Sequence, residues 1–128
     1  MKANFLLVLV FFTSLASCVK RPVDDLDLLI TNQSSCYIGN FFLYGSDHIN
    51  CLVPTKTVVD TVNLTINAVA KFGTNLKNVK PAVSLSIDSK LTPAMGNWMD
   101  FTLPKKYTVI SGNRQVKKEY TITVVVEG

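Results

Sequence analysis

Histidine and cysteine are scarce in this chain, and charged residues are sparse. The 128 residues include one histidine, His48, and three cysteines, and only 17% are charged. With no CxxC or HxxxH pattern, these few ligands predict neither a metal site nor a cofactor. Because 48% of the residues are hydrophobic, the low charge excludes an intrinsically disordered protein. The length is that of one domain.

Catalytic patterns are missing as well. The chain has no glycine-rich phosphate-binding loop, and His48 stands beside Asp47 and near Ser46 on one loop. Neighbours on a single loop do not converge in the way that a Ser/His/Asp triad requires. A glycosidase needs two carboxylates across a cleft, and nothing in the spacing of the acidic residues places two there. The sequence therefore predicts that the protein is not an enzyme.

Basic residues exceed acidic ones only slightly. The chain has 13 Lys and Arg against 9 Asp and Glu, which gives a formal charge of +4. A nucleic-acid-binding protein concentrates its basic residues in a stripe with aromatic residues among them. No such stripe exists here, so we expect no nucleic-acid partner.

The N-terminus has the pattern of an export signal. Lys2 precedes the apolar run Phe5–Phe12, which is much shorter than the roughly 20 residues of a membrane span and fits a secretory signal. The following Leu15–Cys18 (Leu-Ala-Ser-Cys) resembles the lipobox of bacterial lipoproteins. The resemblance implies that residues 1–17 are removed and that Cys18 is acylated, which attaches the protein to a membrane.

Residues 18–35 are short, polar and mixed in charge, and they contain Pro22. We interpret them as a lipid-anchored tether. The acidic stretch Asp24–Asp27 resembles the surface-export signal of lipoproteins in Bacteroides-type bacteria. That resemblance implies a place on the cell surface, anchored in the outer membrane, with the inner face of the outer membrane as the alternative.

Two cysteines remain after Cys18. Outside the cytoplasm, an even pair such as Cys36 and Cys51 is expected to form a disulfide. On the chain-entropy model, closing this loop would stabilise the fold by about 3 kcal/mol. The alternative is two buried thiols.

Residues 36–128 read as strands, because apolar and polar residues alternate with a period of two. No window favours an amphipathic helix, and Ser111–Asn113 is a candidate hairpin turn. The size and strand number predict an all-β fold, an immunoglobulin-like antiparallel β-sandwich of about seven strands. The expected strands cover residues 37–44, 49–59 (one or two strands), 62–70, 83–88, 107–110 and 120–126.

The C-terminal half carries a further resemblance. The turn Gly73–Leu76, the loop Asp100–Pro104 and the runs Tyr107–Val109 and Tyr120–Val124 are similar to immunoglobulin-like domains of unknown function in surface lipoproteins of Bacteroides-type bacteria. The match covers about residues 62–126. It implies a fold and a cell-surface setting, and it implies no catalytic residue. Independently of the family, Asp100 is expected to cap its turn and Phe101 to fill the end of the sandwich.

The single tryptophan is a candidate ligand contact. Trp98 lies in the loop Met95–Met99, and loops on rigid scaffolds often carry binding residues. Its indole would stack on a sugar ring, or it would instead close the end of the core.

A group of basic residues surrounds the last hairpin. On paired strands they would attract an anionic ligand, or they would protect a sheet edge from aggregation. The group comprises Lys105, Lys106, Arg114, Lys117 and Lys118.

One modification motif is present. Thr61, within Asp60-Thr61-Val62, resembles the O-glycosylation motif of exported proteins in Bacteroides-type bacteria.

Two functional classes follow from these patterns. The first is a non-catalytic, lipid-anchored cell-surface module that binds a glycan or a protein partner or acts as a spacer. The alternative is a periplasm-facing structural lipoprotein of an envelope or pilus-like assembly.

Overall fold

The computed structural model describes residues 22–128. The predicted signal peptide and the predicted lipidation site, Cys18, lie outside the described residues. Among the residues that are described, no helix is both long enough and apolar enough to span a membrane.

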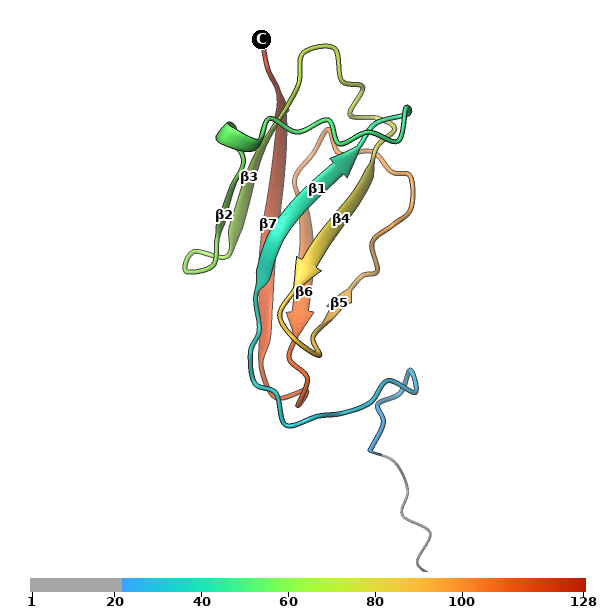
Figure 1. The fold of residues 1–128 in the computed structure, drawn as a ribbon, viewed down its shortest axis with the longest axis vertical. Coiled ribbons are helices and arrows are strands. Elements are labelled where there is room, and N and C mark those ends of the chain that lie inside the picture. The colour runs from blue at the N-terminus through green and yellow to red at the C-terminus, as the bar shows by residue number, and fades with distance from the viewer. Residues whose placement is uncertain (1–21) are drawn as a thin grey trace, which may run out of the picture.

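Seven strands form two sheets that pack face to face (Figure 1). The smaller sheet pairs β1 (Ile38–Tyr44) with β4 (Lys80–Leu85). The larger sheet has the order β2-β3-β7-β6-β5. This arrangement confirms the all-β sandwich of about seven strands. The bounds of the larger sheet are β2 Val58–Asp60, β3 Thr65–Ala70, β5 Lys90–Thr92, β6 Lys105–Ile110 and β7 Lys117–Val126, and a short 3-10 turn, η1, covers Pro54–Lys56.

The core follows from the alternation within each strand. On β7, Tyr120, Ile122 and Val124 are buried, while Thr121 and Thr123 between them point outward, as the pleat of a strand requires. The inward residues of the two sheets meet in one cluster, which includes Ile38, Phe41, Leu43, Ile66, Ala68, Tyr107 and Val109, together with Phe101 from the loop before β6.

One strand pair departs from the expected antiparallel arrangement. β3 runs parallel to β7, with Thr65 opposite Thr121 and Ala70 opposite Val126. A parallel pair needs a long crossover between its strands, and the chain from β4 to β6 supplies it. The prediction of a wholly antiparallel sandwich is wrong at this pair, because alternation reports which face is buried and not the direction of the neighbouring strand.

The expected strand over 62–70 begins later than predicted. Val62 is exposed in the turn before β3. The Asp60 carboxylate accepts hydrogen bonds from the backbone amides of Val62 and Asn63, both at 2.9 Å, and Leu64 has a φ of 56°. Local turn bonds therefore replace strand pairing over these residues.

The predicted disulfide between Cys36 and Cys51 is wrong, because both cysteines are free. Cys36 precedes β1, whereas the Cys51 amide donates to the Leu43 carbonyl near the other end of β1 at 2.8 Å. Along an extended strand this separates the two cysteines by about 20 Å, and a disulfide needs Cα atoms within about 7 Å. The Cys36 thiol instead donates to the Val109 carbonyl at 3.3 Å, and the Cys51 thiol donates to the Leu43 carbonyl at 3.2 Å.

The two thiols should differ in reactivity. Burial raises the pKa of both, but Cys36 is buried and Cys51 only partly so. We expect iodoacetamide to modify Cys51 slowly in the native protein and Cys36 only after unfolding. Mass spectrometry before and after denaturation measures this, with Cys51→Ser as the control that abolishes the native reaction. If neither Cys36 nor Cys51 is labelled even in denaturant, the two cysteines are joined by a disulfide after all.

Candidate functional site

Loops from three parts of the chain gather at one end of the sandwich, the end at which the C-terminus lies (Figure 1). They are residues 45–51, which follow β1, residues 71–78, which follow β3, and residues 94–99, which lie between β5 and β6. We call this region the loop end. Residues 22–35 lie at the opposite end of the sandwich (Figure 1).

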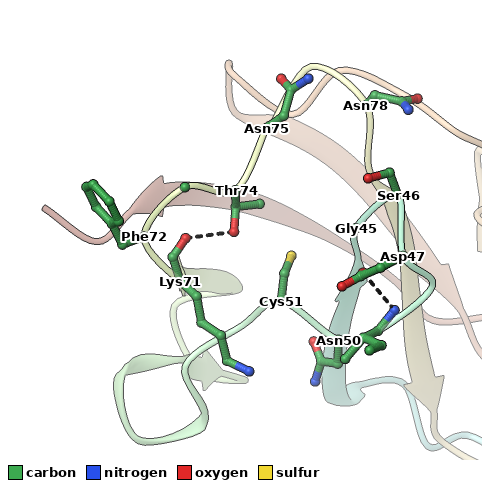
Figure 2. Close-up of a pocket in the computed structure, with 12 residues that line it drawn as sticks. Gly45, Ser46, Asp47, Asn50, Cys51, Lys71, Phe72, Thr74, Asn75 and Asn78 are labelled. Atoms are coloured by element: carbon green, nitrogen blue, oxygen red, sulfur yellow. Dashed lines mark hydrogen bonds between the residues drawn. The ribbon is translucent and has the colours of Figure 1, made fainter.

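One pocket at the loop end, of about 360 Å³, lies between residues 45–51 and 71–78. Figure 2 shows the Cys51 thiol at its centre, Asp47 and Lys71 on either side of it, and the Phe72 ring turned away. Local bonds hold both loops: the Asp47 carboxylate accepts from the Ile49 amide at 3.1 Å, and the Thr74 hydroxyl donates to the Lys71 carbonyl at 2.7 Å. The lining is mostly polar.

A second pocket, of about 250 Å³, lies on the outer face of the smaller sheet. Its lining includes Tyr44, His48 and Lys80. The register of β1 and β4 places Tyr44 opposite Lys80, so the two side chains share a face. Gly96, with a φ of 108°, brings the loop after β5 to the rim. The pocket therefore combines aromatic rings with a single cation.

Trp98 lies beside this second pocket. Its indole meets the His48 ring edge-on, with centroids 5.4 Å apart and an interplanar angle of 71°. Trp98 is 41% exposed. The buried ring at this end of the core is that of Phe101, which packs against Phe41 with centroids 6.1 Å apart. This surface position leaves the indole accessible to a ligand. The His48 contact had no sequence signal beyond the loop context of each residue.

The predicted group of basic residues is not brought together. Lys105 lies opposite Ile122, whereas Lys117 lies opposite Ile110 at the other end of the hairpin, so the two lysines are about 17 Å apart. Lys118 is next to Lys117, opposite Val109, and Lys106 lies within 3.7 Å of the Glu119 carboxylate. The Arg114 guanidinium binds Asp24 in the N-terminal segment. The five residues therefore do not form one patch.

Arg114 binds the N-terminal segment. Its Nε donates to the Asp24 carboxylate at 3.0 Å, and Nη2 donates to the Leu29 carbonyl at 3.3 Å. Lys90 Nζ reaches the same Asp24 oxygen at 2.5 Å. The Lys90 hydrogen bond, followed by backbone bonds and the Arg114 hydrogen bond, outweighs desolvation and holds the pKa of Asp24 well below its usual range.

Further bonds tie this segment to the turn between β6 and β7. The Thr31 amide donates to the Gly112 carbonyl at 3.0 Å, and the Asn113 amide donates to the Gln33 carbonyl at 2.8 Å. A Cβ added to Gly112 would lie 2.4 Å from the Thr31 hydroxyl oxygen. Residues 22–33 of the predicted tether therefore lie against the sandwich. The sequence around Asp24 resembles an export signal, and no residue pattern indicates that this segment binds to the sandwich.

Removing the Asp24 charge should release the segment. In Asp24→Asn, Lys90 and Arg114 lose their anionic partner, and we expect limited proteolysis to cut within residues 22–33 much faster than in the wild type. Because folding lowers the Asp24 pKa, its contribution is complete above the ordinary aspartate pKa and is lost only as the pH falls below that range. The control is Asp25→Asn, an exposed neighbour. Equal cleavage of the two variants would contradict the role of Asp24.

Thr61 is exposed in the turn between β2 and β3. Its neighbour Asp60 supports that turn, as described above. The position is accessible to a modifying enzyme, and O-glycosylation of Thr61 stays a prediction. Among the described residues, no three His, Cys, Asp or Glu side chains group as metal ligands.

Solved structures with a similar fold come from Bacteroides species. A Bacteroides fragilis protein, proposed to be secreted, has a TM-score of 0.59 at 18% identity over 73% of this chain and 97% of its own. A Bacteroides thetaiotaomicron protein, proposed to be a glycoside hydrolase, has a TM-score of 0.51 at 23% identity over 75% of this chain. A DUF4623 family protein from Bacteroides eggerthii has a TM-score of 0.51 at 16% identity over 73% of this chain.

The chain spans only part of the length of two of these proteins. The chain spans 25% of the proposed glycoside hydrolase and 22% of the DUF4623 family protein. At such identities the likeness concerns the fold alone. No curated protein matches this chain.

A family model covers more than half of the chain. Residues 48–124 match the family described as "SGBP, N-terminal". The matched region runs from the loop after β1 to the end of the buried part of β7, and so includes Trp98, the last hairpin and most of the residues that line the two pockets. The chain therefore belongs to the SGBP N-terminal family, a family of Bacteroidetes surface proteins.

Proposed function

We propose that this protein is a non-catalytic, lipid-anchored module of the Bacteroidetes outer membrane that presents its loop end at the cell surface and binds a glycan there. One observation carries the proposal. The segment that follows the predicted anchor, Cys18, is docked at one end of the sandwich, whereas both pockets and Trp98 lie at the other. Membership of a family of surface proteins associated with glycan binding supports the same function.

The site that we assign to the glycan is the second pocket with Trp98. An exposed indole offers a flat apolar face, and Tyr44 and His48 add further ring surface on which the C–H groups of a sugar can pack. Lys80 supplies a hydrogen-bond donor. The volume of about 250 Å³ lies below the range of pockets that enclose drug-sized ligands. A pocket of this size suits one sugar ring of a longer chain.

Trp98→Ala is expected to weaken glycan binding at least about fivefold, the effect of losing an aromatic anchor worth more than 1 kcal/mol. Because the indole is 41% exposed, we expect the free energy of unfolding to change by about 1 kcal/mol or less. A glycan array followed by titration calorimetry measures the first effect, and thermal melts measure the second.

The matched comparison is the double variant Lys117→Ala, Lys118→Ala. These two lysines lie beside the turn between β6 and β7, at the end of β7 away from the loop end, so the double variant should leave glycan binding unchanged. If the wild type binds nothing on the array and Trp98→Ala merely melts early, the loop is structural and the domain acts as a spacer.

The side of the membrane is tested separately. Protease added to intact cells should remove a displayed domain. Full protection on intact cells, with digestion after lysis, would favour the periplasm-facing structural lipoprotein.

A further inference from the structure

The docked N-terminal segment presents apolar side chains to solvent. Residues 22–30 form a hairpin, closed by a bridge between Val23 and Leu29 and by the Ile30 amide, which donates to the Pro22 carbonyl at 2.7 Å. Leu26 is 70% exposed and Leu29 55%. Four of the nine residues are exposed aliphatic side chains: Val23, Leu26, Leu28 and Leu29. Val23 and Leu29 lie opposite each other and so share one face of the hairpin, and Leu26 lies at its tip. We call these four exposed side chains the hairpin leucine surface.

Hydrogen bonds and ion pairs fix the conformation of this hairpin. The Asp24 carboxylate accepts from the amides of Leu26 and Leu28 at 2.9 and 3.0 Å, and its other oxygen binds Lys90 and Arg114. Only 10% of the Asp24 side chain is exposed. The surface is therefore fixed relative to the sandwich.

A neighbouring turn extends the same end of the molecule. The turn between β4 and β5 contacts the chain just after the docked segment, where the Ser89 hydroxyl donates to the Ser35 carbonyl at 3.0 Å. It also contacts Arg114, which reaches the Asp88 carbonyl at 3.4 Å. Ile87, in this turn, is 61% exposed. The apolar character of this end is thus shared by two elements that lie together at the lower end of Figure 1.

The length of chain between the anchor and the hairpin limits where this surface can lie. From Cys18 to Pro22 there are four peptide units, which span at most about 14 Å when extended. Acyl chains on Cys18, an anchor that belongs to the function proposed above, would place that residue at the lipid headgroups. The headgroup layer on each side of a bilayer is itself about 5–8 Å thick. The hairpin leucine surface is therefore confined to the immediate neighbourhood of the lipid.

We propose that the hairpin leucine surface rests in the interface of the membrane that holds the Cys18 anchor. A lipid anchor alone leaves a domain free to rotate, and a second apolar contact fixes its orientation. Asp25 and Asp27, exposed beside Leu26, stay in the headgroup water. The sandwich then stands on the membrane, and β7, with 10 residues, carries the loop end about 33 Å outward.

Fluorescence quenching by the lipid tests this contact. The acylated chain, purified from membranes, is placed in phosphatidylcholine vesicles with or without brominated acyl chains. In a Trp98→Phe background, Leu26→Trp is expected to lose about half or more of its emission in brominated vesicles, because interfacial side chains reach the headgroup and acyl boundary. Phe72→Trp in the same background is the matched control. It replaces a residue that is 81% exposed at the loop end, and it should lose nothing.

Three results would overturn the proposal. Equal emission of Leu26→Trp in both kinds of vesicle means that the surface does not touch lipid. Equal quenching of both reporters means that the sandwich has no fixed orientation. A blue shift of Leu26→Trp that grows with protein concentration, without quenching, means that a second copy covers the surface. The mass of the Cys18 peptide is measured first. If Cys18 carries no acyl groups, the proposed lipid anchor is wrong as well. If Cys18 is acylated but Leu26→Trp is not quenched, only the proposed contact of the hairpin with lipid is wrong.

Discussion

Phe101→Ala is expected to lower the free energy of unfolding by about 3–5 kcal/mol, the usual cost of truncating a fully buried aromatic residue. The Phe101 side chain is completely buried against Phe41, and its amide donates to the Leu76 carbonyl at 2.7 Å. Domains of this size are stable by about 5–15 kcal/mol, so the variant should lose a large part of its stability. Urea denaturation of the purified protein measures the change.

Phe72→Ala provides the control for that measurement. Phe72 is the same residue type at 81% exposure, and its truncation should change stability by about 0.5 kcal/mol or less. If the two variants unfold at the same urea concentration, the ring of Phe101 does not fill the end of the core.

Cys18→Ser is expected to abolish membrane attachment. Serine has no thiol to form the thioether of a lipid anchor, so the chain should remain unprocessed or become soluble. Palmitate labelling and membrane fractionation of cells that express the variant measure the loss. Because two or three acyl chains hold far more firmly than one, we expect the wild type to be almost entirely in the membrane fraction.

Cys36→Ser is the matched control for the anchor. This cysteine is buried in the sandwich, so its replacement should leave labelling and fractionation unchanged. Normal labelling of Cys18→Ser would eliminate the lipoprotein assignment, and with it the membrane contact proposed for the hairpin.

Several local features agreed with the pattern of residues. The alternation over 120–124 marks the buried and exposed faces of β7, whereas Val126, predicted on the same face, is exposed. The predicted role of Asp100 also holds: its carboxylate accepts from the Thr102 amide at 2.8 Å, so the turn is fixed and the adjacent Phe101 is buried. Both features depend on neighbours within two residues, and for that reason a linear pattern can report them.

Only part of the candidate site could be predicted from the sequence. Trp98 drew attention as a lone tryptophan on a loop, but its partner His48 lies 50 residues earlier and shows no matching pattern. The lysines of the last hairpin looked like one group because they are close in sequence. In the antiparallel pair, β6 and β7 carry Lys105 and Lys117 to opposite ends.

The sequence by itself determined the all-β character, the buried face of strands such as β7 and the turn at Asp100. The short strand β5 and the exact bounds of β3 and β4 had no clear pattern in the sequence. Only the tertiary structure decided the parallel pairing of β3 with β7, the separation of Cys36 from Cys51, and the docking of Asp24 onto Lys90 and Arg114. The first group depends on side-chain direction and hydrogen bonds within a few residues, where the backbone repeat fixes geometry. The second depends on which distant segments pack together, and that choice is made by the free energy of the whole core.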